Sequence, residues 1–166
     1  MKKLLPLFAA VFLATSAQAQ MSPSAMSGTL NTQEFVKTVA SSDMFEIETS
    51  RVVNERSQSQ DVQNFAAAMI RDHEKTSSEL KGAVDKALLP SSMNPDHQKK
   101  LDELRAQKGA QMDEMYKKQQ IQAHQDAISL FEAYSQRGDN PALKQWAAAK
   151  LPTLREHYEH AQKLKY

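Results

Sequence analysis

Three histidines and one glutamate have the types and the spacing to bind a metal ion. Glu46, His73, His124 and His157 each fall in a separate stretch of helical periodicity, on the arc that carries the apolar residues. Neutral imidazoles with one carboxylate suit Zn, Cu(II), Ni or Fe(II), whereas Ca and Mg prefer oxygen ligands. The leading hypothesis is one transition-metal ion held by these four side chains, provided that the helices bring them together.

Capping residues and helix breakers divide most of the chain into four long helices and a short one. Asn31 with Glu34 opens the first helix, Asn94 with Pro95 opens the short one, and Gly109 breaks or ends it. The predicted ranges are 31–57, 59–88, 95–107, 110–136 and 141–164. Long helices joined in this way predict an all-α fold. We expect an antiparallel four-helix bundle with a short extra helix between the second and third long helices.

The four candidate ligands are expected at similar heights in such a bundle. Glu46 and His73 lie about 18 and 22 Å of helix rise from the turn that joins the first two helices. His124 and His157 lie about 22 and 27 Å from the turn before the last helix. In helices of about 40 Å, all four come near the midplane, whichever way the third helix runs. Asp113 is about 16 Å of rise from His124 and is expected to stay outside the site.

A metal-free hydrogen-bond network is an alternative explanation of the same residues. Burying a polar group without partners costs about 1–3 kcal/mol, so these side chains need an ion, water or one another. In this alternative the protein is a structural or stress-related interaction module. An enzyme that uses an open metal position is a third hypothesis, which requires a water-accessible cleft. The sequence leaves all three open and identifies no catalytic residue.

The apolar stripes also predict which side chains form the core and which histidines are exposed. Helical periodicity places inward-facing leucines and the single tryptophan on the last three long helices. We expect four of these residues to be buried in the core: Leu80, Leu130, Trp146 and Leu154. His97 lies in the first turn of the short helix and His160 at the edge of an apolar stripe, so both are expected to face water.

The first nineteen residues are typical of a secretory signal peptide. Lys2 and Lys3 precede an apolar run of about 11 residues, and Ala17-Gln18-Ala19 follows. The run is shorter than the roughly 20 apolar residues that span a bilayer. We expect cleavage after Ala19, a flexible tether over 20–30 and a helical domain over 31–165. This organisation predicts a soluble periplasmic protein without membrane insertion once the signal is removed.

Composition and charge exclude several classes of protein. The 166 residues include 21 Lys and Arg against 20 Asp and Glu, a net charge of +1 that becomes −1 without Lys2 and Lys3. Nucleic-acid-binding proteins show a basic excess or a basic stripe, so no nucleic-acid partner is expected. The absence of cysteine excludes disulfides, thiolate metal sites and a cysteine nucleophile. No protein partner or substrate is indicated.

Motifs in the four long helices together resemble those of a known family. They are Asp43-Met44-x-Glu46-Ile47, Phe65-Ala66-x-x-Met69-Ile70-x-Asp72-His73, Asp113-x-x-Tyr116-x-x-x-Gln120-x-x-x-His124, and Pro141-x-Leu143-Lys144-x-Trp146-Ala147 with Leu151-Pro152-x-Leu154-x-x-His157. Over about residues 31–165 the chain is similar to the bacterial exported family called domain of unknown function 4142. The resemblance implies a ferritin-like fold and brings no settled activity.

The same motifs depart from ferritin chemistry. Di-iron carboxylate proteins use Glu-x-x-His on two helices, together with two further glutamates. Here Ile70 stands three residues before His73, and Leu154 stands three residues before His157. We therefore expect neither oxygen-activating di-iron chemistry nor iron storage.

Overall fold

The structure, a computed structural model, describes residues 28–166. These residues form five α-helices, and no strand ladder occurs among them. The helices are α1 (Thr32–Arg56), α2 (Gln60–Ala83), α3 (Pro95–Ala106), α4 (Gly109–Arg137) and α5 (Pro141–Lys163), with a short 3-10 helix η1 (Lys86–Leu88) after α2. The prediction of an all-helical fold is confirmed. The signal-peptide prediction for residues 1–19 and most of the predicted tether lie outside the described residues.

Asparagine side chains begin three of the helices as the sequence predicts. Asn31 accepts hydrogen bonds from two backbone N–H groups of the first turn of α1, and Asn140 does the same in α5. Asn94 accepts one such bond, from the backbone N–H of His97 in α3. These bonds satisfy N–H groups that have no partner inside the helix.

Two predicted boundaries differ from the structure. The second helix was expected to reach residue 88 but ends at Ala83, because the Asp85 side chain accepts a hydrogen bond from Ala87 N–H and starts η1. Gly109 is the first residue of α4 and has a φ of 54°, a value that glycine adopts easily. The glycine therefore both separates α3 from α4 and opens α4.

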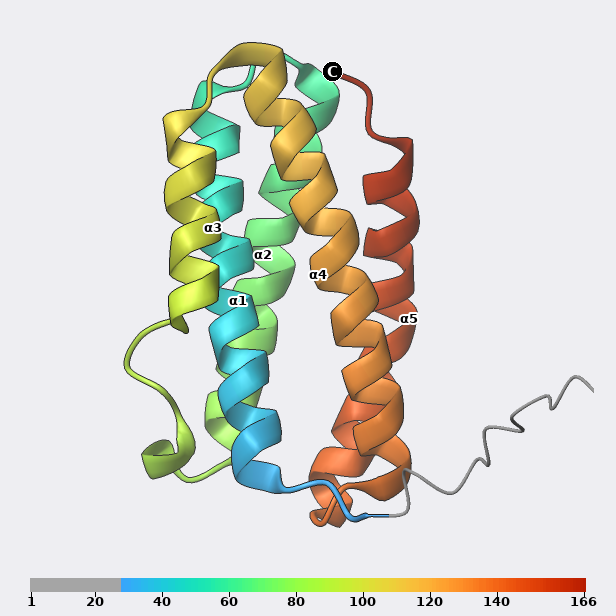
Figure 1. Cartoon of the computed structure of the whole chain (residues 1–166). Helices are drawn as coiled ribbons and strands as arrows, with labels where there is room; N and C mark the ends of the chain where they lie inside the picture. The colour runs from blue at the N-terminus through green and yellow to red at the C-terminus, as the bar shows by residue number, and fades with distance from the viewer. Residues whose placement is uncertain (1–27) are drawn as a thin grey trace, which may run out of the picture.

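The four longer helices lie side by side, and α3 lies alongside α1 (Figure 1). The most extensive packing joins α1 with α2 and α4 with α5, and α1 also contacts both α3 and α4. Among residues 28–166, no helix combines the length and the hydropathy required to cross a membrane.

Two apolar clusters form the core, one near each end of the helices. The first contains Phe35, Val36, Val39, Leu80, Phe131, Tyr134, Leu143, Ala147, Leu151 and Leu154. The second contains Val53, Val62, Phe65, Ala66, Met69, Leu104, Met112, Tyr116, Ala161 and Leu164. Each long helix passes from one cluster to the other, and between them it carries its candidate ligand: Glu46, His73, His124 or His157. The candidate site is thus a polar layer between two apolar ones.

The core prediction is correct for two residues and wrong for two. Leu80 and Leu154 are buried. Leu130 and Trp146 are only partly buried, although both pack against the first cluster. Leu130 lines a cavity, and the Trp146 indole donates a hydrogen bond to Glu79 at the surface of α2, so neither side chain is fully enclosed.

Candidate metal centre

Three histidines from three helices meet in the polar layer between the apolar clusters. His73 of α2, His124 of α4 and His157 of α5 each offer a nitrogen that lies within 4.8 Å of those of the other two. Their ring centroids are 5.3 to 5.8 Å apart. His73 and His124 are buried, and His157 is partly buried. The structure therefore brings together the three histidines that the helix geometry places at one height.

A hydrogen bond on the opposite side of the ring orients each of the two buried histidines. The Nδ1–H of His73 donates to the Asp43 carboxylate at 2.9 Å, and Ser77 donates to the other oxygen of Asp43. The Nδ1–H of His124 donates to the backbone carbonyl of Gln120 at 2.9 Å. Because carboxylate and carbonyl oxygens only accept, both rings carry their proton on Nδ1 when neutral. The lone pair of each ring is therefore on Nε2.

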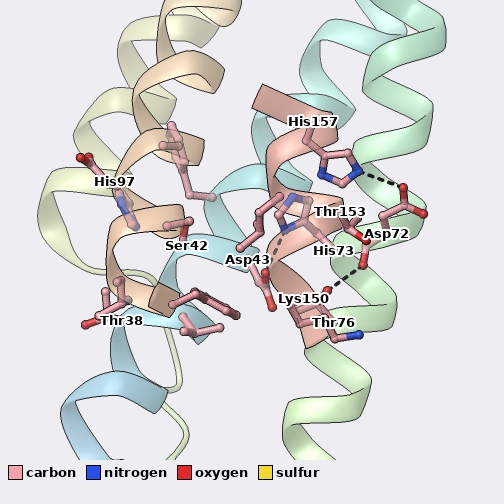
Figure 2. Close-up of a pocket in the computed structure, with 18 of the residues that line it drawn as sticks. Thr38, Ser42, Asp43, Asp72, His73, Thr76, His97, Lys150, Thr153 and His157 are labelled. Carbon is pink, nitrogen blue, oxygen red and sulfur yellow. Dashed lines mark hydrogen bonds and ion pairs between the residues drawn. The ribbon is translucent and has the colours of Figure 1, made fainter. Parts of the chain in front are cut away.

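His157 is held in the opposite tautomer. Its Nε2 lies 3.1 Å from an oxygen of Asp72, which belongs to α2. Donation to this carboxylate places the lone pair of the neutral His157 ring on Nδ1. Figure 2 shows the paired arrangement, with His73 joined to Asp43 and His157 joined to Asp72.

The remaining nitrogen of each ring, an acceptor when that ring is neutral, is buried and has no hydrogen-bond partner. Within the described part of the chain, nothing bonds to Nε2 of His73, Nε2 of His124 or Nδ1 of His157. Buried polar atoms of native proteins are normally satisfied, and each exception requires an explanation. Three such atoms in one cluster, each on a ring whose other nitrogen is anchored, could hold a metal ion.

Burial keeps two of the three rings neutral. Desolvation lowers the pKa of His124 to about 3, and the neighbouring charge of His73 adds to this effect. Desolvation likewise lowers the pKa of His157 to about 4, although Asp72 opposes the shift. For His73, desolvation lowers the pKa, but the bond to Asp43 and nearby carboxylates outweigh it, so the net shift is upward. At neutral pH, His124 and His157 therefore present lone pairs without first releasing a proton.

Glu46 lies beside the histidine cluster and is not one of the mutually close ligand groups. Its side chain is buried, and burial raises its pKa to about 7, partly offset by the charge of His73 and by the Gln120 side chain. Gln120 is near enough to influence the carboxyl, yet neither Glu46 oxygen completes a hydrogen bond of normal geometry with any described residue. Glu46 is therefore a buried carboxyl group near His73 that does not belong to the cluster of three histidines.

Sequence reasoning missed the two aspartates that orient the rings. Asp43 lies three residues before Glu46, on the arc of α1 that faces inward. This position predicts that Asp43 is buried, but it does not predict the hydrogen bond to His73. Asp72 precedes His73 in sequence, yet it bonds His157 of another helix. Asp113 stays outside the site as expected and accepts a hydrogen bond from Ser57.

The prediction of a water-facing His97 is wrong. Its ring is half-buried, stacks on Phe45 with a centroid separation of 4.9 Å, and bonds Ser41. Packing of α3 against α1 explains this position, because it covers the first turn of α3. His160 is exposed as expected, with one ring edge against Phe65.

A cavity of about 280 Å³ adjoins the histidine cluster (Figure 2). His73 and His157 line it together with their partners Asp43 and Asp72, whereas His124 does not. The cavity extends from these residues to the side chains of α1, α3 and α4.

A sequence model of the family described as domain of unknown function (DUF4142) matches residues 15–164. No curated protein matches the sequence. Among solved structures, the chain is similar to a DUF305 fragment from Deinococcus radiodurans, with a TM-score of 0.68, 15% identity, and coverage of 82% of this chain and 96% of that one. It is also similar to a DUF305 protein from Streptomyces coelicolor described as secreted, with a TM-score of 0.64, 14% identity, and coverage of 76% and 85%.

A third similar structure is CopM in its Cu(II)-bound form. The TM-score is 0.68 at 17% identity, and the alignment covers 81% of this chain and 95% of CopM. At such identities these three likenesses concern the fold.

Proposed function

We propose that this chain, which belongs to the family described as domain of unknown function (DUF4142), binds one transition-metal ion through His73, His124 and His157. The observation that carries the proposal is the set of three buried, unbonded ring nitrogens. A metal ion satisfies all three at once. The known pattern of carboxylate or carbonyl groups behind metal-binding histidines matches Asp43, Gln120 and Asp72.

The three histidines are the direct ligands in this proposal, and Glu46 acts from beside the ion. A divalent ion would add positive charge next to a carboxyl that is now held partly protonated by burial. The ion would therefore favour the ionised form of Glu46, and the ionised form would in turn stabilise the ion. The proposed role of Glu46 is to neutralise charge.

The ligand set favours Zn, Cu(II), Ni or Fe(II), because imidazole nitrogen suits these ions. Cu(II) is the first to test, because the similar structure of CopM is a Cu(II)-bound form. Zn comes second, because three histidines with one open position form a common zinc arrangement.

We also propose how the helices are arranged and where in the cell the protein is located. We propose that α1, α2, α4 and α5 form an antiparallel, ferritin-like four-helix bundle, with α3 as a short additional helix in the connection between α2 and α4. The contacts of α1 with α2 and of α4 with α5 support this arrangement. We further propose a signal peptide over 1–19, a tether over 20–30 and a periplasmic domain over 31–165, supported by the likeness to a protein described as secreted.

Thermal unfolding of chelator-treated protein with and without metal tests the proposed function. An ion that binds the native state stabilises it by RT ln(1+[L]/Kd), about 2.7 kcal/mol at a hundredfold excess over Kd. Cu(II) or Zn should raise the Tm of the wild type. The effect should fade toward low pH, because the pKa of His73 is raised and its ring gains a proton there.

The matched variants are His124→Ala, which removes a ligand, and His160→Ala, which removes an exposed histidine of α5. His124→Ala should lose most of the metal-dependent rise, and His160→Ala should keep it. A wild type whose Tm no metal changes would support the metal-free network and contradict the proposed site.

A further inference from the structure

The cavity beside the histidine cluster has an apolar wall and a polar end. Side chains of α1, α4 and α5 form the apolar wall: Val39, Phe45, Ala127, Leu130, Phe131 and Leu154. The end near the histidine cluster, the polar end, holds His73 and His157 with Asp43 and Asp72. A few other polar side chains, among them Thr38 and Ser42, line the opposite side (Figure 2). Lining residues that are themselves exposed, among them Lys100 and Asp126, bring the cavity to the protein surface. His73 and His157 therefore line a cavity that opens at the surface, while their unbonded ring nitrogens are buried.

Three histidine ligands leave a coordination position of a tetrahedral ion unfilled by the protein. Sites of this kind hold water or another small ligand at that position. His73 and His157 belong both to the ligand set and to the cavity lining, whereas the third ligand, His124, lies outside the lining. The open position is thus expected on the side of the cluster where the cavity lies.

The volume and the charges restrict what the cavity accepts. A dry apolar cavity of about 150 Å³ is enough to hold benzene, so 280 Å³ holds a body of one or two small rings. The two carboxylates behind His73 and His157 balance the two positive charges of a divalent ion. An ionised Glu46 next to His73 adds further negative charge. The polar end therefore does not attract an anion, which favours an uncharged donor atom.

We propose that the cavity binds a small organic molecule with an apolar body and one uncharged nitrogen or sulfur donor that completes the coordination of the ion. This inference rests on the proposed function, because the ion supplies the site for the donor. The apolar wall would enclose the body of the molecule, and the exposed end would admit it.

The test compares three probes on the full zinc-loaded protein by isothermal titration calorimetry. 4-Phenylimidazole has both the donor and the apolar body, imidazole has only the donor, and toluene has only the body. 4-Phenylimidazole should bind the zinc-loaded protein at least tenfold more tightly than imidazole. Its binding should also weaken at least tenfold when zinc is removed, to about the level of toluene.

Two alanine-to-leucine variants separate the cavity from general effects of substitution. Ala127 lines the cavity, and Ala148 is an exposed residue of α5 outside it. Ala127→Leu should remove the tenfold preference of the zinc-loaded protein for 4-phenylimidazole over imidazole, because the added atoms fill the cavity. Ala148→Leu should retain the preference. Neither position provides a proposed ligand, so both variants should still bind zinc. Zinc binding is therefore measured in both variants before the probes are added.

The outcomes distinguish this inference from the proposed function. If the chain binds zinc but gives equal affinities for 4-phenylimidazole and imidazole, the cavity inference is overturned and the metal site stands. The same conclusion follows if Ala127→Leu binds zinc and keeps the preference. If the chain binds no zinc, the same titrations are made on the Cu(II)-loaded protein. If the chain binds neither ion, the proposed function fails, and this inference fails with it.

Discussion

Asp43 accepts a hydrogen bond from Nδ1 of His73 at 2.9 Å, and both side chains are buried. The bond joins α1 to α2 and fixes the lone pair of the neutral His73 ring on Nε2, the nitrogen that faces no other partner among the described residues. An aspartate in this position behind a metal-binding histidine orients the ring and increases its basicity.

Asp43→Asn should therefore weaken metal binding while the protein still folds. Loss of such an outer partner typically costs 10- to 100-fold in affinity, and the amide retains an acceptor for the ring. Competition titrations with a chromogenic chelator would measure the change. Asp102→Asn, which alters an exposed aspartate of α3, is the matched control and should leave the affinity unchanged. Equal affinities of wild type and Asp43→Asn would show that Asp43 does not support a ligand.

Glu46→Gln should change how the stability of the metal-free protein depends on pH. The folded-state pKa of Glu46 is about 7, above the ordinary value of 4.5, because the side chain is buried. The unfolded chain therefore releases this proton first, and stability is lost as pH rises from 4.5 through 7. Glutamine removes that loss, so the variant should gain up to about 3 kcal/mol relative to the wild type between pH 5 and pH 8.

Urea unfolding at the two pH values measures this relative gain. Glu48→Gln is the control, because Glu48 is a more exposed glutamate on the same helix. A difference between wild type and Glu46→Gln that stays constant with pH would contradict a raised pKa at Glu46.

Truncation of two leucines should give unequal losses of stability. Leu80 is fully buried in the first apolar cluster, so Leu80→Ala should cost about 2–5 kcal/mol. Leu130 is partly buried and already lines a cavity, so Leu130→Ala should cost less than about 2 kcal/mol. Denaturant unfolding of both variants provides the comparison. A larger loss for Leu130→Ala would mean that the cavity is closed in solution.

Export should produce a mature chain that begins at Gln20. The prediction follows from Lys2 and Lys3, the short apolar run and the Ala17-Gln18-Ala19 ending. Intact-mass measurement of protein from the periplasm of an expressing bacterium would identify the cleavage point. Recovery of the full-length chain in the membrane fraction would contradict both the cleavage and the proposed location.

The helices and the meeting of the histidines follow from simple sequence rules. Asn31, Asn94 and Asn140 signal helix starts because their side chains satisfy exposed N–H groups. A rise of about 1.5 Å per residue places His73, His124 and His157 at similar heights, and the structure brings them together. Local geometry is enough here because helices are regular over their whole length.

Hydrogen-bond partners between helices could not be predicted in the same manner. The arc of α1 shows that Asp43 and Glu46 both face inward, but helix rotation by a fraction of a turn decides which one reaches His73. Asp72 bonds His157 because α2 and α5 are neighbours, a fact that lies in tertiary packing. For the same reason, His97 lies half-buried against Phe45, although its position in a first turn suggested exposure.

The proposed binding of one metal ion by His73, His124 and His157 is tested most directly by equilibrium dialysis of the protein against Cu(II) or Zn, followed by elemental analysis of its metal content. The protein should carry no affinity His-tag, and His124→Ala and His160→Ala should be dialysed beside the wild type. We expect one ion per chain in the wild type and in His160→Ala, and almost none in His124→Ala. A wild type without bound metal, or a His124→Ala variant that still holds one ion per chain, would contradict the proposed binding.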